Sequence, residues 1–143
     1  MRIGVRNLGA AIGVVLATLL PYGQTLAQGF TVAAEVRPIL EATRANWVAV
    51  REYDGADLVY FTQLLAWRCG LSEIRYGLNG AEPEIVFAME PCYEGTAQPN
   101  AIKSDAIYLR EALGSVDSIS VRLIFDDGST ADARFERAEV LMP

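Results

Sequence analysis

Strict alternation of apolar and polar residues marks a hairpin between the chain's two cysteines, within the stretch from Trp67 to Cys92. Three apolar residues form the inward face of its first strand: Ile74, Tyr76 and Leu78. Asn79-Gly80 is a turn signal, and the returning strand supplies a matching face of Ile85, Phe87 and Met89. These two runs predict an antiparallel hairpin at the centre of the fold.

The alternation recurs between residues 118 and 136, and here it also sets the length of the loop. A two-residue loop, Asp127-Gly128, would place Leu123 opposite Asp132 and so put a carboxylate into the core. A three-residue loop from Asp126 to Gly128, with Gly128 left-handed, gives apolar partners throughout. It pairs Ile119 with Phe135, Val121 with Ala133 and Leu123 with Ala131. We therefore predict the three-residue loop.

The first part of the mature chain carries mixed signals. Residues 28–45 predict a short helix or an irregular arm, with Pro38 in the first helical turn and helical spacing at Val36, Ile39, Leu40 and Thr43. Alternation from Trp47 to Glu52 then predicts a strand, and Asp54-Gly55 a turn.

Asp57 to Arg68 fits both periodicities, because its apolar residues line a strand face and a helix face equally well. We favour a strand buried on both faces, since β-branched and aromatic residues are frequent in it. A helix here is the alternative and would make the fold α+β. Farther along, Glu90 to Asp105 predicts a long loop that Cys92 fastens to the hairpin, and Ile107 to Arg110 a short strand.

Six or seven short strands separated by turn signals predict an all-β fold, a two-sheet β-sandwich over residues 46–143. The segments AIYLR, GSV and DDGST, together with the hairpin IRYGLNG–EIVFAM, resemble an immunoglobulin-like or fibronectin type III-like domain over about 70 residues. The cysteines flank one hairpin here and do not join two sheets around a Trp, as they do in antibody domains. The resemblance implies a scaffold for binding, although a fold does not determine a function.

Residues 1–27 have the three parts of a secretory signal peptide. Arg2 and Arg6 precede an apolar run from Leu8 to Leu20, and we expect cleavage after Ala27. This run is shorter than the roughly 20 residues that a membrane span needs, and an uncleaved anchor is the alternative. We therefore expect a periplasmic or secreted protein without stable membrane insertion.

Cys69 and Cys92 are the chain's two cysteines, and in an oxidising compartment they predict one disulfide. The alternative is a pair of unpaired buried thiols. A catalytic cysteine is disfavoured because the sequence contains no histidine to activate it.

Charge and the missing histidine exclude several classes of function. The net charge of −6 becomes −8 once Arg2 and Arg6 are removed, so nucleic acid is not an expected partner. Without histidine, the chain can form neither a Ser-His-Asp triad nor one of the usual zinc sites. We expect no enzyme activity, no metal and no cofactor. Two carboxylate pairs, Asp54 with Asp57 and Asp126 with Asp127, could serve a glycosidase or hold calcium, but turn residues explain them better.

Aromatic residues and an arginine form the candidate binding surface: Trp47, Tyr53, Tyr60, Trp67, Arg68 and Tyr93. Ordinary core packing is the competing explanation for the two tryptophans. The predicted function is a small exported interaction or ligand-binding module of the bacterial envelope, whose partner is another exported protein or an envelope glycan. The alternatives are a structural domain of an envelope assembly and a carboxylate-dependent glycoside hydrolase.

Overall fold

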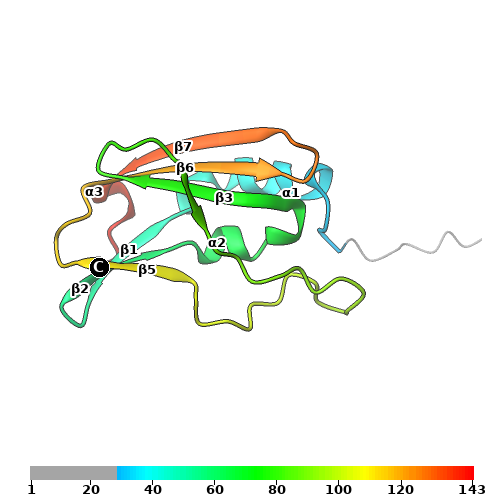
Figure 1. Cartoon of the computed structure of the whole chain (residues 1–143), viewed down its shortest axis with the longest axis horizontal. Coiled ribbons are helices and arrows are strands. Elements are labelled where there is room, and N and C mark those ends of the chain that lie inside the picture. The colour runs from blue at the N-terminus through cyan, green and yellow to red at the C-terminus, as the bar shows by residue number, and fades with distance from the viewer. Residues whose placement is uncertain (1–28) are drawn as a thin grey trace, which may run out of the picture.

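Two antiparallel sheets pack face to face as a β-sandwich in the computed structural model, which describes residues 29–143 (Figure 1). The predicted signal peptide and its cleavage site lie outside the described residues. One sheet has three strands in the order β1 (Ala49–Tyr53), β2 (Ala56–Tyr60) and β5 (Tyr108–Ala112). The other has four, in the order β4 (Ile85–Phe87), β3 (Leu71–Leu78), β6 (Ser118–Phe125) and β7 (Thr130–Glu136).

The core lies between the sheets, where alternate side chains of each strand meet. Val50 and Val59 are fully buried on the three-stranded sheet, and so are Ile74, Ile119, Val121, Leu123 and Phe125 on the four-stranded sheet. Burying one such side chain stabilises the fold by about 1.5–3 kcal/mol relative to leaving it exposed. The sandwich prediction for the two-sheet body is therefore confirmed.

The C-terminal hairpin has the predicted register. Ile119 lies opposite Phe135, Val121 opposite Ala133 and Leu123 opposite Ala131. Its loop has three residues, because the amide of Phe125 donates to the carbonyl of Ser129 (2.8 Å), and Gly128 has a φ of 80°. A left-handed residue suits glycine, whose missing Cβ removes the steric penalty.

β3 and β4 form the predicted antiparallel hairpin, in which Ile74 lies opposite Phe87 and Tyr76 opposite Ile85. Ile85 was predicted to face the core, but it is 54% exposed. The inward face of the returning strand is therefore one residue shorter than predicted. β4 is an edge strand of three residues, and Tyr76 across the ladder is itself only half-buried. This end of the hairpin therefore lies at the rim of the core.

The N-terminal arm is the helix α1 (Ala33–Ala42), which buries Val36 and Leu40. Pro38 lies inside this helix and not in its first turn, so that prediction was wrong. The helix begins earlier because the carboxylate of Asp126, in the β6–β7 loop, accepts a hydrogen bond from the amide of Ala33 (2.8 Å). No local side chain caps this end of the helix. A carboxylate distant in the sequence therefore satisfies the free amide of Ala33.

Residues 57–68 do not form one continuous strand, which corrects the favoured prediction. β2 ends at Tyr60, and Thr62–Leu65 forms the short helix α2. The amide of Phe61 donates to the carbonyl of Ile107 (3.0 Å), and the chain leaves the sheet there with ψ at 20°. A helical turn then buries the adjacent Leu64 and Leu65 on one side, which a strand could not do.

Three short helical segments complete the chain: η1 (Arg44–Asn46), η2 (Arg68–Gly70) and α3 (Arg137–Val140). Within residues 29–143, no helix has the length and apolar character needed to cross a membrane. Cys69 and Cys92 form the predicted disulfide, with Cα atoms 5.0 Å apart. This bond fits an oxidising, extracytoplasmic environment.

Candidate functional site

Two residues of the predicted binding surface are buried. Trp47 has no exposed surface, and its indole nitrogen donates to the carbonyl of Leu40 (2.8 Å). Trp47 therefore packs α1 onto the sandwich, which agrees with the core-packing explanation for this tryptophan. Arg68 is only 2% exposed, so it cannot contact a partner either.

Arg68 instead holds the long segment of residues 88–107. Its guanidinium donates to five main-chain carbonyls at 2.8–3.1 Å, those of Leu65, Glu90, Pro91, Asn100 and Ala101. No carboxylate within residues 29–143 forms a salt bridge with it. The planar fork of five N–H groups suits such a set of acceptors, and a lysine ammonium would not span them.

Trp67 and Tyr93, two further predicted surface residues, are half-buried and lie on this segment's side of the molecule. Trp67 packs edge-on against Phe30, with ring centroids 5.2 Å apart. The hydroxyl of Tyr93 donates to the carboxylate of Glu90 (2.6 Å), and this hydrogen bond raises the pKa of Tyr93. Tyr93 therefore braces the segment that Arg68 and the disulfide hold, whereas Trp67 packs against Phe30, outside the segment.

The two carboxylate pairs have structural roles. Asp126 and Asp127 lie in the β6–β7 loop, as turn residues were expected to. Asp54 is also a turn residue, whereas Asp57 lies in β2 and is fully buried, which corrects the prediction for that pair. No cluster of three potential metal ligands occurs among residues 29–143.

Asp57 joins the two sheets. Its carboxylate lies 2.6 Å from the guanidinium of Arg137, which follows β7, and accepts hydrogen bonds from the amides of Gly114 and Val116 (3.0 and 3.1 Å). The hydrogen bond from Arg137 is the main cause that lowers the pKa of Asp57 to about 2, against the opposing effect of burial. Arg137 also reaches Glu52 in β1 (2.6 Å).

The outer face of the three-stranded sheet carries the exposed aromatic residues. The register places Tyr60 beside Tyr108 in one row, and Leu58 between Arg51 and Arg110 in the next. The rings of Tyr60 and Tyr108 are 5.4 Å apart, and Arg51 lies 4.8 Å from the ring of Tyr53. Figure 1 shows no helix or strand of the described residues over this face. We call it the tyrosine face and define it by Tyr53, Tyr60, Tyr108, Arg51 and Arg110.

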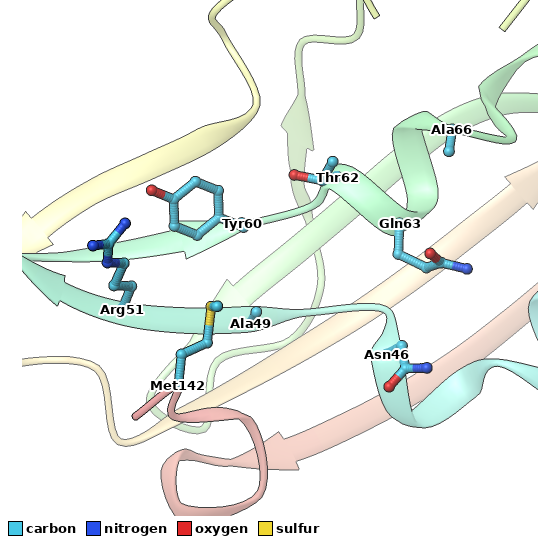
Figure 2. Close-up of a pocket in the computed structure, with 8 residues that line it drawn as sticks. All are labelled: Asn46, Ala49, Arg51, Tyr60, Thr62, Gln63, Ala66 and Met142. Carbon is cyan, nitrogen blue, oxygen red and sulfur yellow. The ribbon is translucent and has the colours of Figure 1, made fainter. Parts of the chain in front are cut away.

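A groove with a volume of about 510 Å³ opens at one end of the tyrosine face (Figure 2). Its lining combines apolar atoms of Ala49, Ala66, Tyr60 and Met142 with four polar side chains, those of Asn46, Arg51, Thr62 and Gln63. The chain's last residues form one wall, because the amide of Met142 donates to the carbonyl of Val50 in β1 (2.8 Å).

Several polar side chains of the groove lining form no hydrogen bond or salt bridge with the rest of the described chain. Arg51 is the one arginine among the nine in residues 29–143 that has neither a hydrogen bond nor a salt bridge to the described chain. Within the same residues, the side chains of Asn46, Tyr60 and Thr62 also have no hydrogen-bond partner, and Gln63 has one long contact, to Thr43 (3.3 Å). These groups remain able to bind a ligand.

Of the predicted surface, Tyr53 and Tyr60 share the tyrosine face, at opposite ends of the β1–β2 pair. The alternation in β5 could also have identified Tyr108, which lies two residues before Arg110 on the same strand face. Asn46, Thr62, Gln63 and Met142 carry no sequence signal for a groove, because they come from three separate parts of the chain, η1, α2 and the residues after α3, and meet only in the folded chain. Comparison with protein-family models, with curated proteins and with solved structures finds no match to this chain.

Proposed function

We propose that the protein is a small exported binding module without catalytic activity, and that its partner docks on the tyrosine face. One observation carries this proposal: three tyrosines and two arginines share an uncovered sheet face, with Tyr53 56% and Tyr108 40% exposed. Tyrosine and arginine are enriched in binding sites, because each combines a large contact area with hydrogen-bonding capacity.

The disulfide supports the proposal that the protein functions in the periplasm or outside the cell. A bond that closes a loop of this length adds roughly 3 kcal/mol in the chain-entropy picture, and it persists only where the surroundings are oxidising.

An immunoglobulin-like or fibronectin type III-like topology is part of the proposal, and the strand order supports it. The first, second and fifth strands form one sheet, and the third, sixth and seventh lie in the other. In immunoglobulin domains, strands A, B and E share one sheet and strands C, F and G the other. β4 then corresponds to the additional strand that follows strand C.

The alternative of a carboxylate-dependent hydrolase finds less support. A glycosidase needs one carboxylic acid with a raised pKa as proton donor. Asp57 is the buried carboxylate of the predicted pairs, and its lowered pKa and its ion pair with Arg137 suit a structural anion.

The test compares two pairs of exposed apolar residues. Mature protein immobilised on beads is incubated with envelope extract, and bound protein and glycan are analysed for the wild type and two double variants. Tyr53→Ser with Tyr108→Ser should abolish the specific capture. Ile85→Ser with Val86→Ser should leave it unchanged. These side chains are at least comparably exposed (54% each, against 56% for Tyr53 and 40% for Tyr108) but belong to the other sheet. Equal capture by all three proteins would contradict docking on the tyrosine face, and urea unfolding checks that both variants fold.

A further inference from the structure

We infer that the groove beside β1 binds an acidic sugar, with its carboxylate on Arg51 and a sugar ring against Tyr60. This assignment rests on the proposed binding function and names the class of ligand for one part of the tyrosine face. The groove's volume of about 510 Å³ lies within the range of small-ligand sites, roughly 300–1,000 Å³.

Charge complementarity at Arg51 favours an anionic ligand. The other eight arginines of residues 29–143 donate to carboxylates, hydroxyls or main-chain carbonyls, and Arg51 alone does not. The chain has a net charge of −6, so an unpaired guanidinium is a local exception to its acidity. Arginine binds a carboxylate through two parallel N–H···O hydrogen bonds, which makes an anionic group the natural ligand.

The remaining lining suits a ring that carries hydroxyl groups. Figure 2 shows Arg51 and Tyr60 next to each other, with Met142 across the opening near Ala49. The aromatic ring and the methionine provide an apolar contact for a sugar's C–H groups. The amides of Asn46 and Gln63 and the hydroxyl of Thr62 can both donate and accept, as sugar hydroxyls require.

The edge of β1 explains why a sugar fits better than a peptide. An extended peptide binds a sheet by pairing its backbone with a free strand edge. Here the carbonyl of Val50 already accepts the amide of Met142, and Leu141 bridges to Val50 in parallel. The main chain of Val50, at the edge of β1 next to the groove, is therefore already engaged, which favours recognition by the side chains of the groove.

The experiment titrates mature protein with an oligomer of galacturonic acid and follows backbone amide shifts by NMR and affinity by calorimetry. The carboxyl-reduced oligomer and a peptide with a free C-terminal carboxylate are the comparison ligands. We expect the acidic oligomer to shift resonances of Ala49, Arg51 and Thr62. We expect Arg51→Gln, and separately reduction of the carboxyl groups, to weaken binding about tenfold or more. Arg134→Gln, on the exposed face of β7, should leave the affinity unchanged.

Three results would overturn the assignment: no shifts at the groove with the acidic oligomer, equal affinity of wild type and Arg51→Gln, or equally strong shifts with the peptide. None of these decides the proposed function, because the capture experiment depends on Tyr53 and Tyr108, which lie outside the groove lining. A module that captures a partner through the tyrosine face but ignores acidic sugars would keep the proposed function and lose this inference.

Discussion

The C-terminal hairpin and the segment of residues 88–107 hold their backbones in opposite ways. In the hairpin, β6 and β7 pair residue by residue, so each position repeats the same local contacts. The segment has no helix or strand, and its path depends on a few contacts from residues distant in sequence. These are the disulfide, the guanidinium of Arg68 and the side chain of Asn100, which accepts from the amide of Cys69 (2.9 Å) and donates to the carbonyl of Phe30 (2.9 Å).

The difference shows how stability is distributed. A ladder spreads its stabilisation over many residues, whereas the segment concentrates it in the disulfide and in the side chains of Arg68 and Asn100. Single substitutions should therefore be moderate in the hairpin and severe at Arg68, although about half of the segment's own residues are exposed.

The largest effect is expected at Arg68. Arg68→Met keeps much of the buried apolar stem but leaves five carbonyls without their donor, and we expect a loss of about 4 kcal/mol in the free energy of unfolding. Arg75→Met is the control, because Arg75 pairs only with Glu73 at a partly exposed site and should lose less than about 1 kcal/mol. Urea unfolding measures both. Similar losses would mean that Arg68 does not anchor the segment.

The next effect tests the ladder. Leu123→Ala removes a fully buried side chain opposite Ala131 and should cost about 3 kcal/mol. Arg122→Ala, one residue away on the outer face, should cost at most about 0.5 kcal/mol despite its ion pair with Asp132. The measurement is again urea unfolding. If Arg122→Ala were as damaging as Leu123→Ala, the two faces of β6 would be assigned the wrong way round.

Asp57 extends the comparison to an anion, because it holds the turn at residues 114–116 much as Arg68 holds its segment. Its pKa is about 2 in the folded protein and 3.8 in the unfolded chain, so its stabilising contribution is complete above about pH 4 and is lost as the pH falls towards 2. A shift of this size corresponds to about 2 kcal/mol.

Unfolding free energies measured from neutral to acidic pH should fall less steeply in Asp57→Asn than in the wild type between about pH 4 and pH 2. Asp54→Asn is the matched control at an exposed turn position, and it should keep the wild-type slope. An unchanged slope in Asp57→Asn would show that another carboxylate governs acid stability.

The smallest effect concerns two left-handed glycines, one in each region. Gly128→Ala should cost about 1 kcal/mol, because a Cβ is disfavoured at its φ of 80° and the ladder on both sides prevents relaxation. Gly95 has a similar φ of 74° but lies in an exposed turn of the segment, so Gly95→Ala should cost less. A larger cost at Gly95 would show that the turn is as firmly held as the hairpin loop.

The same contrast explains what could be predicted from the sequence. The register of β6 and β7 was predictable because apolar partners recur with a period of two and one loop length satisfies them all. The disulfide followed from two cysteines in an exported chain. Tyr53 could be assigned to the surface because it stands beside the Asp54-Gly55 turn, whereas Tyr60, at the far end of β2, has no such local signal.

Arg68 and Asp57 could not be placed in this way. The acceptors of Arg68 are main-chain carbonyls, which every residue has and no sequence pattern marks. Asp57 follows a turn in the sequence, and only the distant Arg137 makes its burial favourable. The groove is hidden for the same reason, because its polar lining comes from elements whose proximity is a result of folding.

The anchoring of residues 88–107 by Arg68 also bears on how this protein can change over evolution. Because the guanidinium contacts carbonyl oxygens, most side chains of the segment could be replaced without altering a single acceptor. The exceptions are Glu90, Cys92, Tyr93 and Asn100, since their side chains make anchoring contacts of their own. The exposed stretch from Glu94 to Gln98 is therefore a place where lineages, or a randomised library, could diversify the surface while the scaffold beneath stays constant.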